Sequence, residues 1–120
     1  MARFSAILME HFQEPRNQGR MGSANRTGQA SISGGATFVV YLRIEGDRVS
    51  KATFESFGCG VTTASGSMLT ELIERRSIAE CLAITADDLS AALGGVPPDK
   101  RHCPMVAVAA LHNALRSGEI

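Results

Sequence analysis

Two adjacent segments with the pattern of paired β-strands constrain the fold of this 120-residue chain most strongly. Residues 37–44 are rich in β-branched and aromatic side chains, and residues 49–57 alternate polar and apolar ones. Residues 45–48, between them, include a glycine and an aspartate and have the composition of a tight turn. The sequence therefore predicts an antiparallel hairpin, and the remaining segments must pack around it.

The segments outside this hairpin have the periodicity of helices. Apolar side chains recur every three or four positions in residues 3–14, 61–76 and 104–117, which is typical of a helix with one buried face. Residues 77–93 suit two shorter helices. The chain is thus predicted to contain one helix before the hairpin and several after it.

Local signals mark where these elements begin. Ser77 and Thr85 are the expected N-caps of the short helices, and Asp88 would complete part of a capping box with Thr85. Pro104 is expected as the first residue of the last helix, because proline has no N–H group to leave unpaired there. Residues 16–35, rich in Gly, Asn, Ser and Arg, predict an irregular loop that leads to a short strand.

This order of elements predicts a single α+β domain over residues 1–120. A chain of this length can bury one hydrophobic core and has no room for a second. We expect a small antiparallel β-sheet of about three strands, packed with helices on one face.

Composition excludes several classes of function. Lys and Arg together number 12, as do Asp and Glu, so no net field draws the chain to nucleic acid or to an anionic membrane. The longest apolar run, Met105–Leu111, is too short to span a bilayer. The first residues do not form a secretory signal, and the three cysteines form no disulfide framework. We therefore expect a cytoplasmic protein with free thiols.

Two cysteines lie where helices are predicted to begin. Cys59 stands between Gly58 and Gly60, at the change from strand to helix, and Cys103 follows His102 at the start of the last helix. A helix N-terminus stabilises an anion by about 0.3–1 kcal/mol, which lowers the pKa of a thiol by less than about one unit. Two such thiols with an adjacent imidazole are typical of a thiolate metal site.

The residues alone leave the role of these two cysteines open. A cysteine is often a small buried apolar side chain, and neither of the two belongs to a Cys-x-x-Cys motif. Their glycine and proline neighbours favour a site, whereas Cys81 stands among apolar residues of a predicted helix and is interpreted as structural. His102 is equally compatible with a surface or capping role, and His11 and His112 are interpreted as structural.

Three distinctive motifs follow one another along the chain: residues 10–19, residues 57–60 with the small side chains of 64–67, and residues 96–103. They resemble the opening signature, the central cysteine loop and the Leu-Pro-Pro-x-Lys motif with its trailing His-Cys in U-type iron–sulfur cluster scaffold proteins. These are the NifU N-terminal and IscU-like domains. The resemblance covers almost the whole chain and implies a SufE/NifU-like fold. The uninterrupted stretch between the two cysteines is more similar to the IscU type than to the zinc-bound SufU type, which carries an insertion.

The resemblance assigns roles to the residues that match these motifs. It implies that Cys59, His102 and Cys103 bind iron, a [2Fe–2S] cluster or, alternatively, zinc. Cys103 would also accept a persulfide from a cysteine desulfurase. No catalytic residue of an enzyme is implied.

The resemblance also implies partners. Pro97 and Pro98 would contact an Hsp70-type chaperone, with Val96 in place of the usual leucine, and Lys100 would lie beside the metal site. A cysteine desulfurase and apo iron–sulfur client proteins are the other partners implied. A homodimer is compatible with the sequence.

One departure from the family pattern bears on activity. The family's first metal-binding loop reads Cys-Gly-Asp, and counting back along the hairpin places Ser33-Gly34-Gly35 there. A serine hydroxyl is a hard, normally protonated donor and a poor match for iron or zinc where a thiolate is expected. Three good ligands are then left, while structural zinc takes four and a [2Fe–2S] cluster usually takes four.

Two functional hypotheses follow. The first is a scaffold-like protein that binds iron, a labile [2Fe–2S] cluster or zinc and takes part in cluster assembly or transfer, its open position filled by Ser33 or by a partner. The second is a degenerate relative that acts as a zinc-binding or metal-free regulatory module for desulfurase or chaperone. A zinc deaminase is excluded, because the chain lacks the His-x-Glu and Pro-Cys-x-x-Cys motifs of that class.

Overall fold

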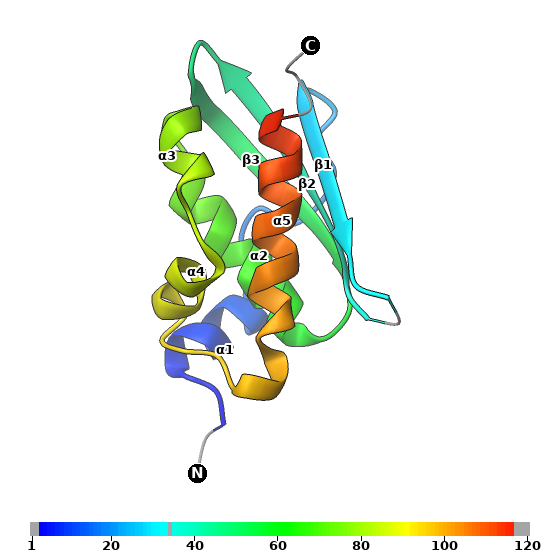
Figure 1. Ribbon diagram of the computed structural model, residues 1–120, viewed down its shortest axis with the longest axis vertical. Helices are drawn as coiled ribbons and strands as arrows, with labels where there is room; N and C mark the ends of the chain where they lie inside the picture. Colours follow the sequence, from blue (N-terminus) through cyan, green and yellow to red (C-terminus); the bar gives the residue numbers. More distant parts are fainter. Residues whose placement is uncertain (1–2, 34, 117–120) are drawn as a thin grey trace.

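The computed structural model describes residues 3–33 and 35–116 and shows a three-stranded antiparallel sheet with helices on one face (Figure 1). The strands lie in the order β1-β2-β3, with the following bounds: β1 Arg26–Ser31, β2 Thr37–Glu45 and β3 Arg48–Phe57. The α+β class, the three strands and the single helical layer predicted from the sequence are therefore confirmed.

The β2–β3 hairpin forms where the sequence predicts it. Glu45 pairs with Arg48, and Gly46 between them has a φ of +66°, which glycine adopts at little cost. Along β2 every second side chain is buried, as expected for a strand with one face on a core. The buried residues of β2 are Phe38, Val40, Leu42 and Ile44.

Five α-helices and one short 3₁₀ helix are found within the described residues. Their bounds are α1 Ala6–Gln13, α2 Gly60–Ile73, α3 Ile78–Leu82, α4 Ala86–Ala92, η1 Pro98–Lys100 and α5 His102–Arg116. The helix before the hairpin, the long helix after it and the two short helices lie where they were predicted. Helix α1 is shorter than predicted at both ends, and α2 begins one residue earlier and ends three residues earlier. None of the described helices is long and apolar enough to cross a membrane.

Both short helices begin with reciprocal capping. Ser77 accepts a hydrogen bond from the backbone N–H of Glu80, and the Glu80 carboxylate accepts one from the backbone of Ser77. Thr85 and Asp88 form the same arrangement at α4. Each box satisfies two backbone donors that a helix start would leave unpaired, which confirms the predicted N-caps and allows helices this short to form.

The last helix begins two residues earlier than predicted. Pro104 was expected as its first residue, but α5 starts at His102. The first turn of a helix has no intrahelical partner for its N–H groups, so proline is tolerated anywhere within that turn. Cys103 is consequently the second residue of the helix and lies inside its first turn.

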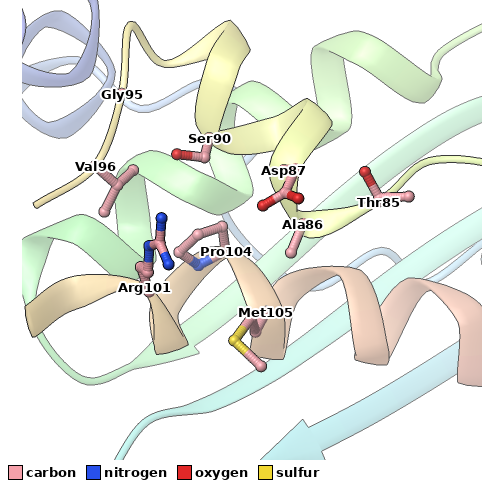
Figure 2. Close-up of a pocket in the computed structure, with 9 residues that line it drawn as sticks. All are labelled: Thr85, Ala86, Asp87, Ser90, Gly95, Val96, Arg101, Pro104 and Met105. Carbon is pink, nitrogen blue, oxygen red and sulfur yellow. The ribbon is translucent and has the colours of Figure 1, made fainter. Parts of the chain in front are cut away.

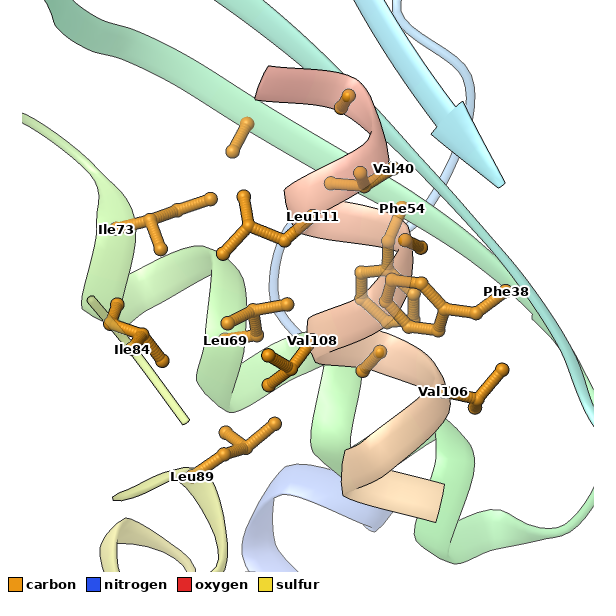
Figure 3. Packing of buried hydrophobic residues seen from close by; sticks show 14 of the residues in the cluster. Phe38, Val40, Phe54, Leu69, Ile73, Ile84, Leu89, Val106, Val108 and Leu111 are labelled. Carbon is orange, nitrogen blue, oxygen red and sulfur yellow. The ribbon is translucent and has the colours of Figure 1, made fainter. Parts of the chain in front are cut away.

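The core lies between the sheet and the two long helices (Figure 3). The rings of Phe38 and Phe54 stack with centroids 5.4 Å apart on the inner face of the sheet. Helix α2 approaches them closely at Gly66, where a Cβ atom would lie 2.4 Å from the Phe54 ring. The buried residues form one cluster, and the single domain over residues 1–120 stays a prediction.

Candidate metal centre

The fold brings Cys59 and Cys103 together although 44 residues separate them. Cys59 is the N-cap of α2 and lies two residues after the end of β3, and Cys103 lies in the first turn of α5. The two Sγ atoms are 3.6 Å apart. Two ligands at about 2.3 Å from one tetrahedral ion stand about 3.8 Å apart. The separation therefore suits two thiolates that bind the same metal ion.

The two thiols differ in their environments. Burial by itself raises the pKa of Cys59, but hydrogen bonds from the backbone N–H groups of Thr62 and Val61 and from the Cys103 thiol bring it below its ordinary value. Burial raises the pKa of Cys103 to about 11. Cys59 is thus the better thiolate of the pair, because the backbone N–H groups of Thr62 and Val61 at the start of α2 face its sulfur.

His102 is the first residue of α5 and is half-buried. Within residues 3–33 and 35–116, no three His, Cys, Asp or Glu side chains gather closely enough to hold a metal ion. The structure thus brings the thiols of Cys59 and Cys103 together, but the His102 imidazole does not complete a three-ligand metal site with them. Ligation by His102 stays a prediction.

Ser33 lies exposed in the loop between β1 and β2, and its neighbour Gly34 is outside the described residues. The loop is closed by a hydrogen bond of 2.9 Å from the Ile32 N–H to the Ala36 carbonyl. Ala36 in turn lies beside Gly58, where an added Cβ would come within 3.0 Å of it. Ser33 therefore belongs to the loop at the same end of the sheet as the Cys59 loop, and its place in the metal site stays a prediction.

An apolar cavity of about 230 Å³ opens beside Cys59. The α1 helix forms one wall, and the lining residues are Phe4, Leu8, Met9, Phe12, Cys59, Gly60, Val61 and Lys100. Phe12 packs against Gly60 so closely that a Cβ there would lie 2.4 Å from its ring. The resemblance implied that Lys100 lies beside the site, and Lys100 does line this cavity. The α1 wall was not predicted, because the 45% exposure of Phe12 is seen only in the fold.

Residues 10–19, the first of the three motifs, hold the α1 wall of the cavity in place. His11 is buried, with its Nδ1 2.7 Å from the Ser67 hydroxyl oxygen on α2. The Arg16 N–H donates to the same oxygen, and the Asn17 side-chain amide donates to Thr70. The motif therefore ties α1 to α2, and with it the wall of the cavity beside Cys59.

The residues interpreted as structural are held by contacts away from the two thiols. Burial lowers the pKa of His11, and His112 Nε2 lies 3.1 Å from the carbonyl oxygen of Ile84. Cys81 is fully buried, and its thiol donates to the Ile73 carbonyl at 3.8 Å. Burial raises the pKa of Cys81 to about 11. These environments support the structural interpretation of all three.

The predicted partner-binding motif lies directly before α5. Val96 and Pro97 are half-buried, and Pro98 is exposed at the start of η1. Figure 2 shows Val96 and Arg101 at one end of a second cavity, of about 470 Å³, between α4 and the first turn of α5. The exposed Met105 lines the same cavity. Contact of this motif with a chaperone stays a prediction.

Comparison with known proteins gives the family. Residues 3–118 match the family described as NifU-like N terminal domain. The chain belongs to this family. It is 35% identical over 113 residues to "Iron-sulfur cluster assembly scaffold protein IscU 1" of Archaeoglobus fulgidus, covering 93% of this chain and 74% of that protein. It is also 36% identical over 118 residues to "Iron-sulfur cluster assembly protein IscU" of Plasmodium falciparum, covering 95% and 72%.

Solved structures support the fold of this NifU-like domain. A crystal structure of a protein described as hypothetical superposes with a TM-score of 0.78 at 25% identity, covering 92% of this chain and 95% of the other. A NifU-like N-terminal protein from Brucella abortus superposes with a TM-score of 0.74 at 14% identity, covering 93% and 91%. The SufE/NifU-like fold implied by the sequence resemblance is confirmed.

Proposed function

We propose that this NifU-like domain is a scaffold-like protein of iron–sulfur cluster assembly. It binds iron, a labile [2Fe–2S] cluster or zinc and takes part in cluster assembly or transfer. The observation that carries the proposal is the 3.6 Å separation of the Cys59 and Cys103 sulfur atoms at the starts of two helices. Family membership and the names of its relatives support the same role.

Cys59 and Cys103 are the donors that this chain offers to one metal ion. Soft thiolates suit iron in a cluster as well as zinc. His102, one residue from Cys103, is the proposed third ligand and must turn toward the thiols to bind. Ser33, water or a partner then takes the fourth position, since this chain has a hydroxyl where a thiolate is expected.

An incomplete ligand set suits a cargo that must be passed on. A cluster bound by fewer than four strong protein ligands dissociates more readily than one in a closed site. In this role the protein holds and delivers its cargo and is not itself an enzyme. Its cysteines stay reduced, as expected for a protein of the cytoplasm.

The proposed partners follow from the same role. A cysteine desulfurase supplies sulfur, with Cys103 as the acceptor implied by resemblance, and apo iron–sulfur client proteins receive the cluster. An Hsp70-type chaperone binds at Val96, Pro97 and Pro98, with Lys100 beside the site. A homodimer is one means of supplying the missing ligand.

One observation favours a second function. Within the described residues, no three potential ligands gather around the paired thiols. A relative that has lost cluster assembly would keep its partner-binding surface and bind zinc weakly or no metal. It would then act as an interaction or regulatory module for desulfurase or chaperone.

Metal retention by cysteine variants tests the proposed site. Purified protein is loaded anaerobically with iron and sulfide or with zinc, passed through a desalting column, and its metal content is measured. Cys59→Ser and Cys103→Ser are expected to abolish retention because each removes one of the paired thiolates. Cys81→Ser is the control and is expected to retain metal. Equal retention by all three variants would contradict the assignment.

A further inference from the structure

The cavity of about 470 Å³ between α4 and the first turn of α5 has no role in the metal site. Neither Cys59 nor Cys103 lines it. Its volume falls in the range of about 300–1,000 Å³ that is typical of ligand sites in proteins. The kind of ligand that suits it therefore has to follow from its own lining residues.

The cavity carries one cation and one anion without partners. Arg101 and Asp87 both line it, and both are exposed. Among the described residues, neither of these side chains forms an ion pair or a hydrogen bond. Asp87 would repel an anionic ligand, and Arg101 would repel a cationic one. The two charges together therefore favour a ligand that carries both signs.

The two charges lie at opposite ends of the cavity. Figure 2 shows Arg101 beside Val96 at one end and Asp87 near Thr85 at the other, with Pro104 between them. A free amino acid carries both of its charged groups on one carbon atom, which suits two adjacent partners better than two distant ones. An extended peptide spans about 3.3–3.6 Å per residue, so its side chains can place opposite charges at both ends.

Apolar side chains line the cavity between the charges. Pro104 is buried, Val96 is half-buried, and Met105 is 57% exposed although it is large and apolar. A methionine side chain is flexible and adapts its shape to a partner. These residues thus offer a contact surface for one apolar side chain of a bound peptide.

Two hydroxyl groups add hydrogen-bonding capacity. Thr85 Oγ1 accepts from the Asp88 N–H, which leaves the Thr85 O–H to donate. The Ser90 side chain also lines the cavity and has no partner in the part of the chain that the structure describes. An extended backbone has unpaired carbonyl and N–H groups that such hydroxyls can satisfy.

The wall that follows α4 is held by its own backbone. Gly94 and Gly95 have φ values of +79° and +97°, which reverse the chain at the end of α4. The Gly95 N–H donates to the Ser90 carbonyl at 2.8 Å. A wall that is ordered before binding loses less entropy when a ligand arrives than a flexible loop would.

We propose that this cavity binds an extended segment of a partner protein that carries an acidic, an apolar and a basic side chain in alternate positions. The acidic side chain pairs with Arg101, the apolar one packs on Met105, and the basic one pairs with Asp87. This inference goes beyond the proposed function, because it needs neither a metal ion nor the paired thiols. It is separate from the predicted chaperone contact, since Pro97 and Pro98 do not line the cavity.

The test uses the metal-free protein labelled with nitrogen-15 and the blocked peptide acetyl-Glu-Thr-Leu-Thr-Lys-amide. The first, third and fifth side chains of an extended peptide point the same way, so the two charges and the leucine face the protein together. The titration is followed by NMR chemical shifts. We expect saturable shifts of the backbone amides of Asp87, Val96, Arg101 and Met105, and none around Cys59.

Two further peptides, with Gln in place of Glu or of Lys, identify the charge pairs. Arg101→Gln should weaken binding of the first peptide by about threefold to fivefold, as expected for an exposed ion pair. It should cause no further loss with the peptide that lacks Glu. Asp87→Asn should behave in the same way toward the peptide that lacks Lys.

Two variants control for net charge. Arg116→Gln and Asp47→Asn remove the same charges at exposed positions outside the cavity, and both should bind the first peptide as wild type does. The proposal is overturned by no saturable binding at millimolar peptide, by shifts that map outside the cavity, or by equal losses from the cavity and control variants. None of these measurements involves the thiols, so a failure here is distinguishable from a failure of the metal site.

Discussion

At the scale of single residues, metal binding at the site depends on which further ligands join the two thiols. Cys59 and Cys103 were predicted as a pair because each stands at a helix start, and the fold places them 3.6 Å apart. The Phe12 wall beside them was not predictable, because an apolar residue on an amphipathic helix indicates only burial. Its exposure becomes visible only when the helix is placed against Gly60.

Restoring the missing thiol tests the position of Ser33. Ser33→Cys is expected to strengthen retention of a cluster or of zinc, because it adds a thiolate from the loop at the Cys59 end of the sheet. The measurement is the rate at which a chelator removes metal from wild type and variant. Ser23→Cys, in the segment before β1, is the control for an added thiol elsewhere. Removal at the same rate from Ser33→Cys and wild type would place the hairpin loop too far from the site.

The buried Cys81 predicts a dependence of stability on alkaline pH. Burial raises its pKa from 9.0 to about 11, so the folded protein holds this proton more tightly than the unfolded chain. The contribution is fully present below pH 9 and is lost as the pH rises toward 11. Its size is about 1–3 kcal/mol. It is measured as the loss of unfolding free energy over this range in urea titrations.

Cys81→Ser removes this group and isolates its effect from other titrating residues. The variant is expected to be less stable at neutral pH, since it buries a hydroxyl in a site that fits a thiol, but to lose less stability between pH 9 and 11. Parallel pH profiles for wild type and variant would show that the thiol ionises in the fold as easily as in the unfolded chain.

At the scale of elements, periodicity and caps predicted the hairpin, the helices and the order of both. The start of α5 was missed because proline is compatible with several positions in the first turn. The sequence pattern did not predict which residues of different helices and strands contact one another. The close approach of α2 to β3 at Gly66 is one example, since glycine in a helical stretch indicates only a lower helix propensity.

Gly66→Ala tests this packing. The added Cβ would lie 2.4 Å from the Phe54 ring and 2.7 Å from that of Phe38, and both rings are fully buried. Alanine is favoured in a helix by about 1 kcal/mol, but overpacking of a core costs about 1–3 kcal/mol. We expect a net loss of stability in urea unfolding.

An exposed glycine in the turn before β1 provides the control for the effect of an added methyl group without close contacts. Gly22 has no atom within 4 Å of an added Cβ, so Gly22→Ala should change the unfolding free energy little. A Gly66→Ala variant as stable as wild type would mean that the two rings can shift without cost. The α2–β3 contact would then be looser than described.

At the scale of the whole molecule, one end of the sheet carries the candidate chemistry. The β1–β2 loop, the start of α2 and the start of α5 all lie at the lower end in Figure 1, with α1 beside them. The strand order β1-β2-β3 places the β1–β2 loop and the end of β3 together. The sequence predicted only the β2–β3 hairpin of this order, because β1 lies in a segment with the composition of a loop. The distance between the two thiols follows only from packing of α2 and α5 on the sheet.

We propose that this chain carries an iron–sulfur cargo on the paired thiolates of Cys59 and Cys103, with His102 as third ligand, although Ser33 stands where a further thiolate is expected. The most direct test measures iron, acid-labile sulfide and zinc per chain in one sample after anaerobic reconstitution. We expect iron and sulfide in matched amounts, both lost from Cys59→Ser. Zinc without iron and sulfide, or no metal at all, would contradict it and leave the partner-binding surface as the function of the fold.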